Sequence, residues 1–159
     1  MNINISVQGL DELIDQLHNF ADSMDQRAKE ICRRLAQYGL VLADASFSGA
    51  AYDGTKDVSV TVEQTDNGYR IIAGGTMVLL LEFGAGVTYG GGHPQAAQFG
   101  FGPGTYPGQT HAMTGKGWYL PKAKGGGHTY GNPPSMTMYN TAQDLKREIE
   151  RVAREVLGT

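Results

Sequence analysis

Glu82 is the carboxylate whose sequence neighbours most favour chemistry. It follows the apolar run from Met77 to Leu81 and precedes Phe83, and a carboxyl group buried in such surroundings can act as a general acid. Acid–base catalysis needs a partner within hydrogen-bond reach, and no second acid or histidine stands at a spacing that defines one. We therefore expect Glu82 to cap backbone N–H groups in the glycine turn that follows it, or to pair with a basic group of a neighbouring subunit.

Three histidines, His93, His111 and His128, could together bind a zinc ion and leave its fourth position open. Their separations of 18 and 17 residues match no compact ligand motif. The glycine-rich backbone around them is also too flexible to position the ligands before a metal binds. We expect polar contacts or solvated side chains at these positions, with neither a metal nor a cofactor.

Two groups of glycines have some features of a phosphate-binding loop, but their spacing is wrong. Gly84-Ala85-Gly86 continues to Gly90, which does not fit G-x-G-x-x-G. Gly115-Lys116 is followed by Gly117, where a phosphate-binding loop needs Ser or Thr. The sequence therefore predicts no nucleotide site.

These glycines belong to a segment, residues 84–131, of unusual composition. Its 48 residues include 15 glycines, seven aromatic residues and three lysines, but no Asp or Glu. A flexible linker would be poor in aromatic residues, and a disordered tail would carry a high net charge. Because aromatic side chains left in water forgo a large burial energy, we expect this segment to pack against something, such as a neighbouring subunit.

Length and charge limit the remaining functions. The 159 residues fit one domain, spanning 1–159, and no apolar run approaches the length of a membrane span. The net charge is −3, and it becomes −6 when the segment with its three lysines is left out. This balance argues against nucleic acid as the main ligand. Cys32 cannot form an internal disulfide, and its place beside Ile31 predicts a small buried side chain rather than a nucleophile.

The first half of the chain shows both strand and helix periods. Residues 2–7 alternate polar and apolar side chains, which predicts a short strand. Residues 10–20 have helical spacing, and a longer helix follows over 24–42, with Leu35, Tyr38 and Leu42 in its apolar stripe. Ser48-Gly49 marks its end.

The second half begins with a hairpin. Val58 to Val62 alternates, Asp66-Asn67-Gly68 is a turn signal, and Tyr69 to Ile72 forms the partner strand. Residues 77–83 fit either a buried strand or a helical turn. After Pro133-Pro134, the apolar period predicts a last helix over 138–157.

These elements predict an α+β fold. A small antiparallel sheet is packed by long helices from the two ends of the chain, and residues 84–131 form one large loop excursion that is rich in glycine and aromatic residues.

Four stretches of the chain resemble one family. Leu81 to Gly86 resembles the (Y/F)xxEFG(T/A)G element of phage tail-completion proteins, which are the head–tail joining or neck components related to gene product ten of Hong-Kong-97-type siphophages. Gly117 to Tyr119 resembles the GWW(Y/F) element of relatives from phages of low-GC Gram-positive bacteria. Gly131 to Ala142 resembles TKGxPxRPFMYNTA, and Val7 to Leu13 resembles the opening VxGLDEL.

The resemblance implies a structural virion protein without enzymatic activity, a tail terminator or head–tail joining subunit of the phage neck or tail. It would assemble in the host bacterial cytoplasm as a ring, commonly a hexamer, and bind the tail tube protein and the head connector or closure proteins. DNA would pass through the ring without being a specific ligand, and no membrane would be involved. The residues that we expect at the ring interface are Glu82, Phe83, Phe99, Phe101, Tyr106, Trp118, Tyr119, Tyr130, Met136 and Tyr139.

Other functions stay open at this point. The aromatic residues could instead cover the domain's own core. Within the structural class, the alternative is a head-closure or minor capsid component. From other classes, the alternatives are a small metal-dependent hydrolase and a carbohydrate-binding module.

Overall fold

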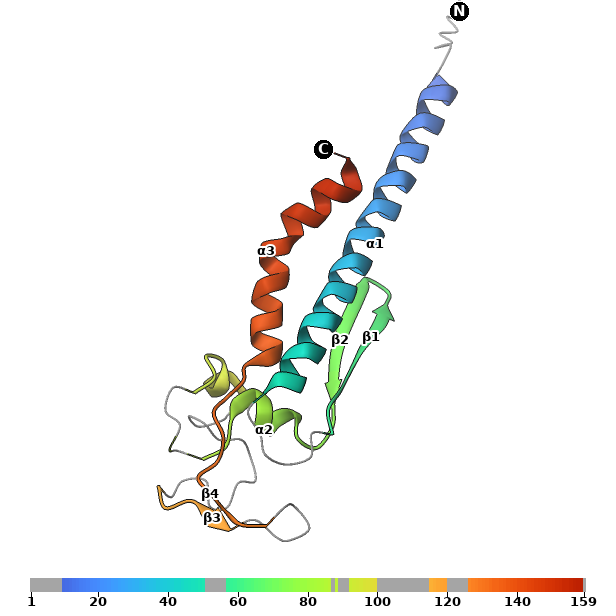
Figure 1. Ribbon diagram of the computed structural model, residues 1–159. Coiled ribbons are helices and arrows are strands. Elements are labelled where there is room, and N and C mark those ends of the chain that lie inside the picture. The colour runs from blue at the N-terminus through green and yellow to red at the C-terminus, as the bar shows by residue number, and fades with distance from the viewer. Residues whose placement is uncertain are drawn as a thin grey trace, which may run out of the picture.

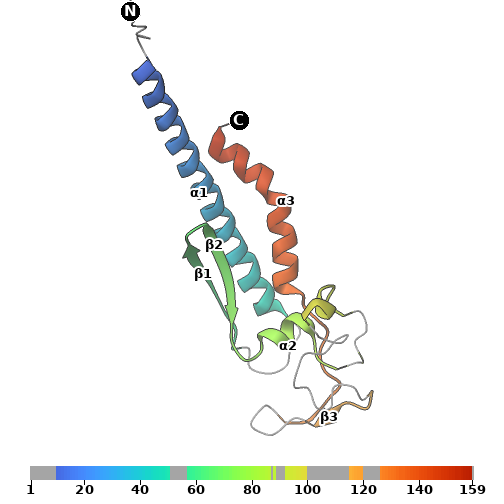
Figure 2. The same cartoon turned by 180° about the vertical axis from the view of Figure 1, so that it is seen from behind.

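Two long helices and a β-hairpin make up the body of the molecule (Figures 1 and 2). The computed structural model describes residues 10–50, 57–86, 88, 92–99, 115–119 and 126–158. The antiparallel hairpin and the long first and last helices confirm the predicted α+β class. In chain order the elements are α1 (Leu10–Gly49), β1 (Ser59–Thr65), β2 (Gly68–Gly74), α2 (Val78–Phe83), the 3-10 helix η1 (Ala96–Phe99), β3 (Trp118–Tyr119), β4 (His128–Thr129) and α3 (Thr137–Leu157).

α1 is a single helix of 40 residues, so the predicted division into two helices over 10–20 and 24–42 is wrong. No proline or glycine occurs between residues 10 and 38, and nothing else in that stretch breaks the helical hydrogen bonds. Cys32 lies on the exposed side of α1, which corrects the prediction of a buried thiol. The strand predicted over residues 2–7 lies outside the described residues.

α1 is the middle layer of the body, with the hairpin on one side and α3 antiparallel to it on the other (Figures 1 and 2). Gly39 explains how closely the three elements can approach. A Cβ at this position would lie 2.4 Å from Cδ1 of Ile71 in β2 and 2.9 Å from Cδ1 of Leu145 in α3. Ala36 and Ala43, about one turn to either side, are buried.

The predicted apolar stripe of α1 is therefore wrong in detail. Tyr38 is exposed, and Leu35 and Leu42 are only half-buried. The buried residues of α1, Ala36, Gly39, Ala43 and Phe47, follow one another in steps of three, four and four residues, so they lie on a single face. Small side chains on this face let β2 and α3 approach it together.

The hairpin forms as predicted. β1 pairs with β2 in the antiparallel register Ser59↔Gly74 to Thr65↔Gly68, so Asp66 and Asn67 form a two-residue turn. Val60 and Ala73 face inward and pack with the buried cluster of Phe47, Ala50 and Leu81.

α2 settles the open choice for residues 77–83 in favour of a helical turn. The Asp57 carboxylate accepts hydrogen bonds from the hydroxyl of Thr76 (2.6 Å) and the backbone N–H groups of Thr76 (2.9 Å) and Met77 (3.0 Å). These bonds, the Thr76 hydroxyl first, hold the pKa of the Asp57 carboxyl below its ordinary value.

α3 begins at Thr137, close to the predicted start, and its buried Val152 faces inward. The Thr137 hydroxyl lies 2.9 Å from the Ser46 hydroxyl, which ties the start of α3 to the end of α1. Within the ranges that the structure describes, none of the helices combines the length and apolar character that a membrane span requires.

Candidate functional site

Two segments about 50 residues apart meet where the glycine-rich segment leaves the body. Ala85 and Asn132 exchange two backbone hydrogen bonds of 2.9 and 3.0 Å. The side-chain amide of Asn132 donates to the Leu80 carbonyl at 3.0 Å, and the backbone N–H and the hydroxyl of Ser135 both donate to the Leu81 carbonyl at 2.8 Å. These bonds satisfy carbonyls that the end of α2 would leave unpaired. We call residues 80–86 together with 131–139 the root.

Three glycines allow the root to close. Gly84, Gly86 and Gly131 all have positive φ angles of 79°, 82° and 97°, which other residues adopt only with strain. A Cβ on Gly131 would lie 1.7 Å from the carbonyl oxygen of Ala85, and one on Gly86 would lie 2.5 Å from the carbonyl oxygen of Tyr130. The backbones approach so closely that no side chain fits between them.

Glu82 caps the N-terminus of α3. Its Oε2 accepts the backbone N–H of Met138 at 2.8 Å, and its Oε1 accepts that of Tyr139 at 3.0 Å. The residue at the N-cap position itself is Met136, which has no side-chain acceptor and a left-handed backbone with φ 53°. Glu82 thus supplies, from 56 residues earlier in the chain, the acceptor that an N-cap residue normally supplies. This corrects the prediction that Glu82 caps the glycine turn or pairs with another subunit.

His93 is the partner of Glu82 that the sequence did not reveal. Its Nε2 lies 3.0 Å from Glu82 Oε1, while the backbone N–H of Gln95 donates to its Nδ1 at 3.1 Å. Because Nδ1 accepts a hydrogen bond, the proton of the neutral ring is on Nε2, which donates to Glu82. The His93 ring also contacts Phe83 and Tyr139, with centroids 4.5 and 5.2 Å apart.

This buried pair is suited to positioning. The side chains of Glu82 and His93 are only 7% and 2% exposed. The carboxylate already accepts three hydrogen bonds, and both nitrogens of the imidazole are engaged. A negative charge at a helix N-terminus is favourable, so the pair fixes α2, η1 and α3 to one another.

The three histidines that were weighed as zinc ligands are not brought together in the part of the chain that can be described. His93 is buried against the root, His128 is exposed in β4, and His111 lies outside the described residues. Among the described residues, no three His, Cys, Asp or Glu side chains gather as a metal site would require.

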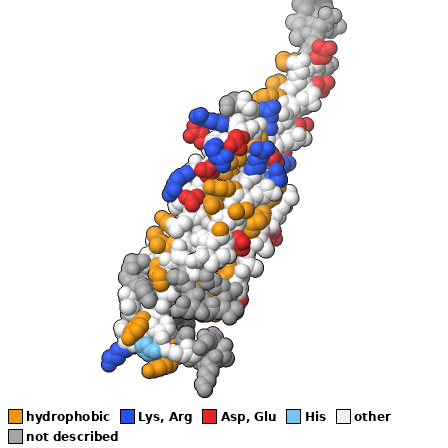
Figure 3. All heavy atoms as spheres, in the orientation of Figure 1, with side chains coloured by type: hydrophobic (Ala, Val, Ile, Leu, Met, Phe, Trp, Pro, Cys, Tyr) orange, Lys and Arg blue, Asp and Glu red, His pale blue; other side chains and the backbone are white. Residues whose placement is uncertain are grey.

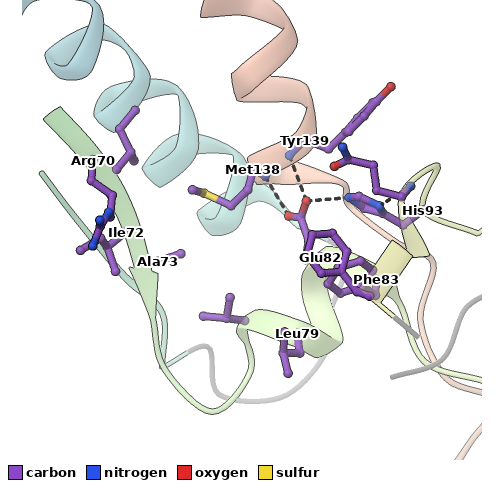
Figure 4. A pocket seen from close by; sticks show the side chains of 13 residues that line it. Arg70, Ile72, Ala73, Leu79, Glu82, Phe83, His93, Met138 and Tyr139 are labelled. Atoms are coloured by element: carbon purple, nitrogen blue, oxygen red, sulfur yellow. Dashed lines mark hydrogen bonds and ion pairs between the residues drawn. The ribbon is translucent and has the colours of Figure 1, made fainter. Parts of the chain in front are cut away.

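An apolar groove opens beside the pair (Figure 4). It has a volume of about 480 Å³ and lies between β2, α2 and the start of α3. Ile72, Leu79 and Phe99 line it and are exposed, and Met138 and Tyr139 form its α3 side. The carboxylate of Glu82 lies at its inner side, engaged as described above.

Exposed aromatic rings gather at the end of the molecule that is opposite to the start of α1 (Figure 1). Tyr119 of β3 is 80% exposed, and its ring meets the ring of His128 in β4 edge to face, with centroids 4.9 Å apart. The His128 ring meets that of Tyr130 in the same way at 4.8 Å. We call these three residues the aromatic patch. Trp118 instead lies over the root, because a Cβ on Gly86 would be 3.2 Å from its ring.

The residues predicted at the interface thus fall into separate groups. Glu82 and Phe83 are buried inside the chain, so their place in the interface is corrected to a place in the root. Trp118, Met136 and Tyr139 are half-buried. Phe99, Tyr119 and Tyr130 are exposed. Phe101 and Tyr106 lie outside the described residues.

Comparisons of the chain with protein-family models, with curated proteins and with solved structures gave no significant match.

Proposed function

We propose that this chain is a structural subunit of a phage neck or tail, a tail terminator or head–tail joining protein that assembles as a ring. The observation that carries the proposal is the position of exposed apolar surfaces at both ends of a long molecule. Leu17 and Phe20 are exposed near the start of α1, and Tyr119 and Tyr130 are exposed at the opposite end. Apolar surfaces that a single chain leaves open mark contact sites for other proteins.

The places of the family-like motifs also support the proposal. The stretches from Leu81 to Gly86 and from Gly131 to Ala142 join along the root, and Trp118 of the third stretch lies over Gly86. Three of the four stretches that resemble the family thus meet at the root. There Gly84, Gly86 and Gly131 let the backbones approach, Glu82 caps α3, and Asn132 donates to the Leu80 carbonyl.

In this proposal the activity is assembly. The Glu82–His93 pair holds a rigid body together, and the aromatic patch and the open end of α1 contact sister copies, the tail tube protein or the head connector proteins. The ring would form in the cytoplasm of the host bacterium and remain in the virion. The net charge of −3 suits a channel wall that does not trap passing DNA.

Locating the protein in purified particles tests this proposal. A small tag after the exposed Gly158, followed by immunolabelling and electron microscopy, should mark one site between head and tail. Label at the tail side of the joint indicates a tail terminator, and label at the head side indicates a head-closure protein. Particles that lack the protein, or carry it all over the capsid, would contradict the neck assignment.

The aromatic patch favours a second candidate, a carbohydrate-binding module. Exposed tyrosines can stack on sugar rings, although Tyr119, His128 and Tyr130 meet edge to face and do not form a flat platform. This candidate predicts a monomer that binds polysaccharide and loses that binding in Tyr119→Ala. A glycan-binding assay on the wild-type protein separates it from the structural proposal.

A further inference from the structure

The first half of α1 extends beyond the described elements that flank it (Figures 1 and 2). α3 reaches the level of Arg34, whose Nη1 lies 3.9 Å from Glu155. The turn end of the hairpin reaches a similar level, where Tyr69 interacts electrostatically with Arg33. Residues 10–30 lie beyond this level, which corresponds to about 30 Å of helix. We call these residues the arm.

The arm carries a narrow seam of large apolar side chains that face solvent. Leu13, Leu17, Phe20 and Met24 follow one another in steps of four, three and four residues, which is the spacing at which two helices pack lengthwise in a coiled coil. Leu17 is 59% exposed and Phe20 is 66% exposed. The four side chains fall within about 60° around the helix, whereas a helix that packs on a globular core presents an apolar face of about 100° or more. The seam, as we call these four residues, therefore fits a single helix as its partner.

The positions that flank the seam on either side carry no charge. They are held by Ile14, Gln16, Ala21 and Ser23. All five carboxylates of residues 10–26 fall at the other positions of the seven-residue repeat, on the far side of the helix, and Figure 3 shows hydrophobic and acidic side chains along different edges of this projecting end. Charges at the flanking positions of a coiled coil set its partner, and like charges there keep identical helices apart. Two identical seams can therefore meet without bringing like charges together.

The seam continues the side of α1 that packs on α3. Leu35 follows Leu17 by 18 residues, which is five helical turns, so both side chains leave the helix in the same direction. Leu35 is half-buried, and the contacts of α3 through Arg34 and Ser46 lie on either side of this direction around α1. In a parallel pair of arms, α1 of the second copy would run on past residue 30 into the place that α3 occupies. The partner helix must therefore run antiparallel to α1, as α3 does.

An antiparallel arm of a second copy covers the open seam from end to end. Each seam residue of one copy then lies opposite a seam residue of the other, Leu17 against Phe20, so a single contact covers both seams. The overlap ends at Arg27, which comes level with Asp11 and Glu12 at the start of the other arm. A parallel pair would instead place Arg27 beside Arg27, where the like charges repel. Shape and charge thus both favour a second copy in the antiparallel direction.

We infer that two copies of the chain pair through their arms as an antiparallel coiled coil of two helices. The interface is isologous, with Leu17 of each copy opposite Phe20 of the other and the two-fold axis between them. The two bodies stand at the outer ends of the paired arms, which leaves the aromatic patch of each copy open for other contacts. The inference stands on the arm alone and goes beyond the proposed ring.

Disulfide formation between two variants tests the pairing directly. In a Cys32→Ser background, Gln16→Cys chains are mixed with Ser23→Cys chains that carry a C-terminal tag. In the antiparallel pair, position 16 of one copy and position 23 of the other lie on the same side, about 3 Å apart along the helix axis, whereas two copies of position 16 are offset by about 7 Å. A disulfide needs Cβ atoms about 4 Å apart. The oxidised mixture should therefore give the heterodimer on a non-reducing gel, and each variant alone should stay monomeric.

The contrary results are equally clear. A mixture that forms no heterodimer, or that forms it no better than either variant forms homodimers, overturns the antiparallel pair. A wild-type chain that stays monomeric on its own and uses Phe20 only to bind tail tubes would assign the seam to another protein, and also overturns it.

Point variants give a second readout with a matched control. Phe20→Glu should raise the dissociation constant of the pair at least tenfold, because a carboxylate then enters the seam of each copy. Asn19→Glu adds the same charge at the neighbouring exposed position, outside the seam, and should change the constant less than twofold. Sedimentation over a range of concentrations measures both. At a concentration where the wild-type chain is monomeric, both variants should keep its melting temperature, because both side chains face solvent in the isolated chain.

The outcomes separate the inference from the proposed function. A chain that is located at the neck of particles but forms no heterodimer overturns the inference alone. A chain that forms the heterodimer but is absent from particles overturns the proposed function alone. A heterodimer together with weaker pairing in Phe20→Glu supports the inference whatever the location of the protein.

Discussion

Replacing Glu82 with glutamine tests the role of the root most sharply. Glu82→Gln keeps the size of the side chain but removes its charge and one of its two acceptor oxygens. Three donors point at the carboxylate, from Met138, Tyr139 and His93. The new amide nitrogen has to face at least one of them, which leaves a buried donor without an acceptor.

The magnitude follows from these contacts. A buried unsatisfied donor costs about 1–3 kcal/mol, and losing the negative charge at the N-terminus of α3 costs up to about 1 kcal/mol more. We therefore expect Glu82→Gln to lower the free energy of unfolding by about 1–4 kcal/mol. For a chain of 159 residues, this corresponds to a fall of roughly 2–16 °C in melting temperature.

Urea unfolding followed by far-ultraviolet circular dichroism measures the change. All variants should be compared at one protein concentration, because association shifts apparent stability. Glu63→Gln is the matched control: its carboxylate is exposed on β1, 3.8 Å from Arg70, and its loss should cost less than about 0.5 kcal/mol. If Glu82→Gln is no less stable than this control, the cap does not hold the root together.

Three further predictions concern the root, α2 and the aromatic residues. Gly131→Ala should lower the unfolding free energy by about 2 kcal/mol or more, because its Cβ would clash across the root. Gly127→Ala is the control: a Cβ there has no atom within 4 Å, so this variant carries only the strain of a positive φ angle. Urea unfolding compares the two variants. Since folding lowers the pKa of the Asp57 carboxyl from its ordinary value of 3.8, its contribution to stability is present above that value and is lost as the pH falls through the folded-state pKa. Asp57→Asn should flatten this acid limb in melting curves taken at several pH values, and an unchanged limb would contradict a stabilising role for the bonds from Asp57 to Thr76 and Met77. Trp118→Ala should lower the melting temperature, because the ring lies over the root, whereas Tyr119→Ala should weaken assembly and leave the melting temperature unchanged. The opposite result would assign Tyr119 to the fold and Trp118 to the interface.

Much of the scaffold could be predicted because its signals are local. The hairpin follows from alternating valines and the Asp66-Asn67-Gly68 turn, and the last helix follows from its apolar period after Pro133-Pro134. The boundaries predicted for the glycine-rich segment, 84–131, fall within one residue of the Ala85↔Asn132 bridge that closes it.

The errors come from contacts between distant segments. The inner face of α1 depends on Gly39, whose closeness to Ile71 and Leu145 the apolar period along the helix does not reveal. The bonds of Glu82 reach 56 and 57 residues along the chain. They replace a cap that Met136 cannot provide. The sequence did not reveal this need, because the residue before the predicted start at 138 is Thr137, which is itself a favourable N-cap residue.

The open first half of α1 could not be recognised from the sequence, which predicts two shorter helices over 10–20 and 24–42. In the structure α3 has 21 residues against the 40 of the single α1, so an antiparallel partner of that length cannot cover the whole helix. The direction in which α3 runs, and hence which half of α1 stays open, needed the structure.

The mass of the wild-type protein under native conditions, measured from micromolar to millimolar concentration, tests the central claim most directly. A discrete closed multiple of the 17.1 kDa chain, which dissociates in Phe20→Glu but not in Asn19→Glu, is the expected result. A wild-type chain that stays monomeric over the whole range, with or without tail tubes present, would contradict the claim that these exposed surfaces bind sister copies.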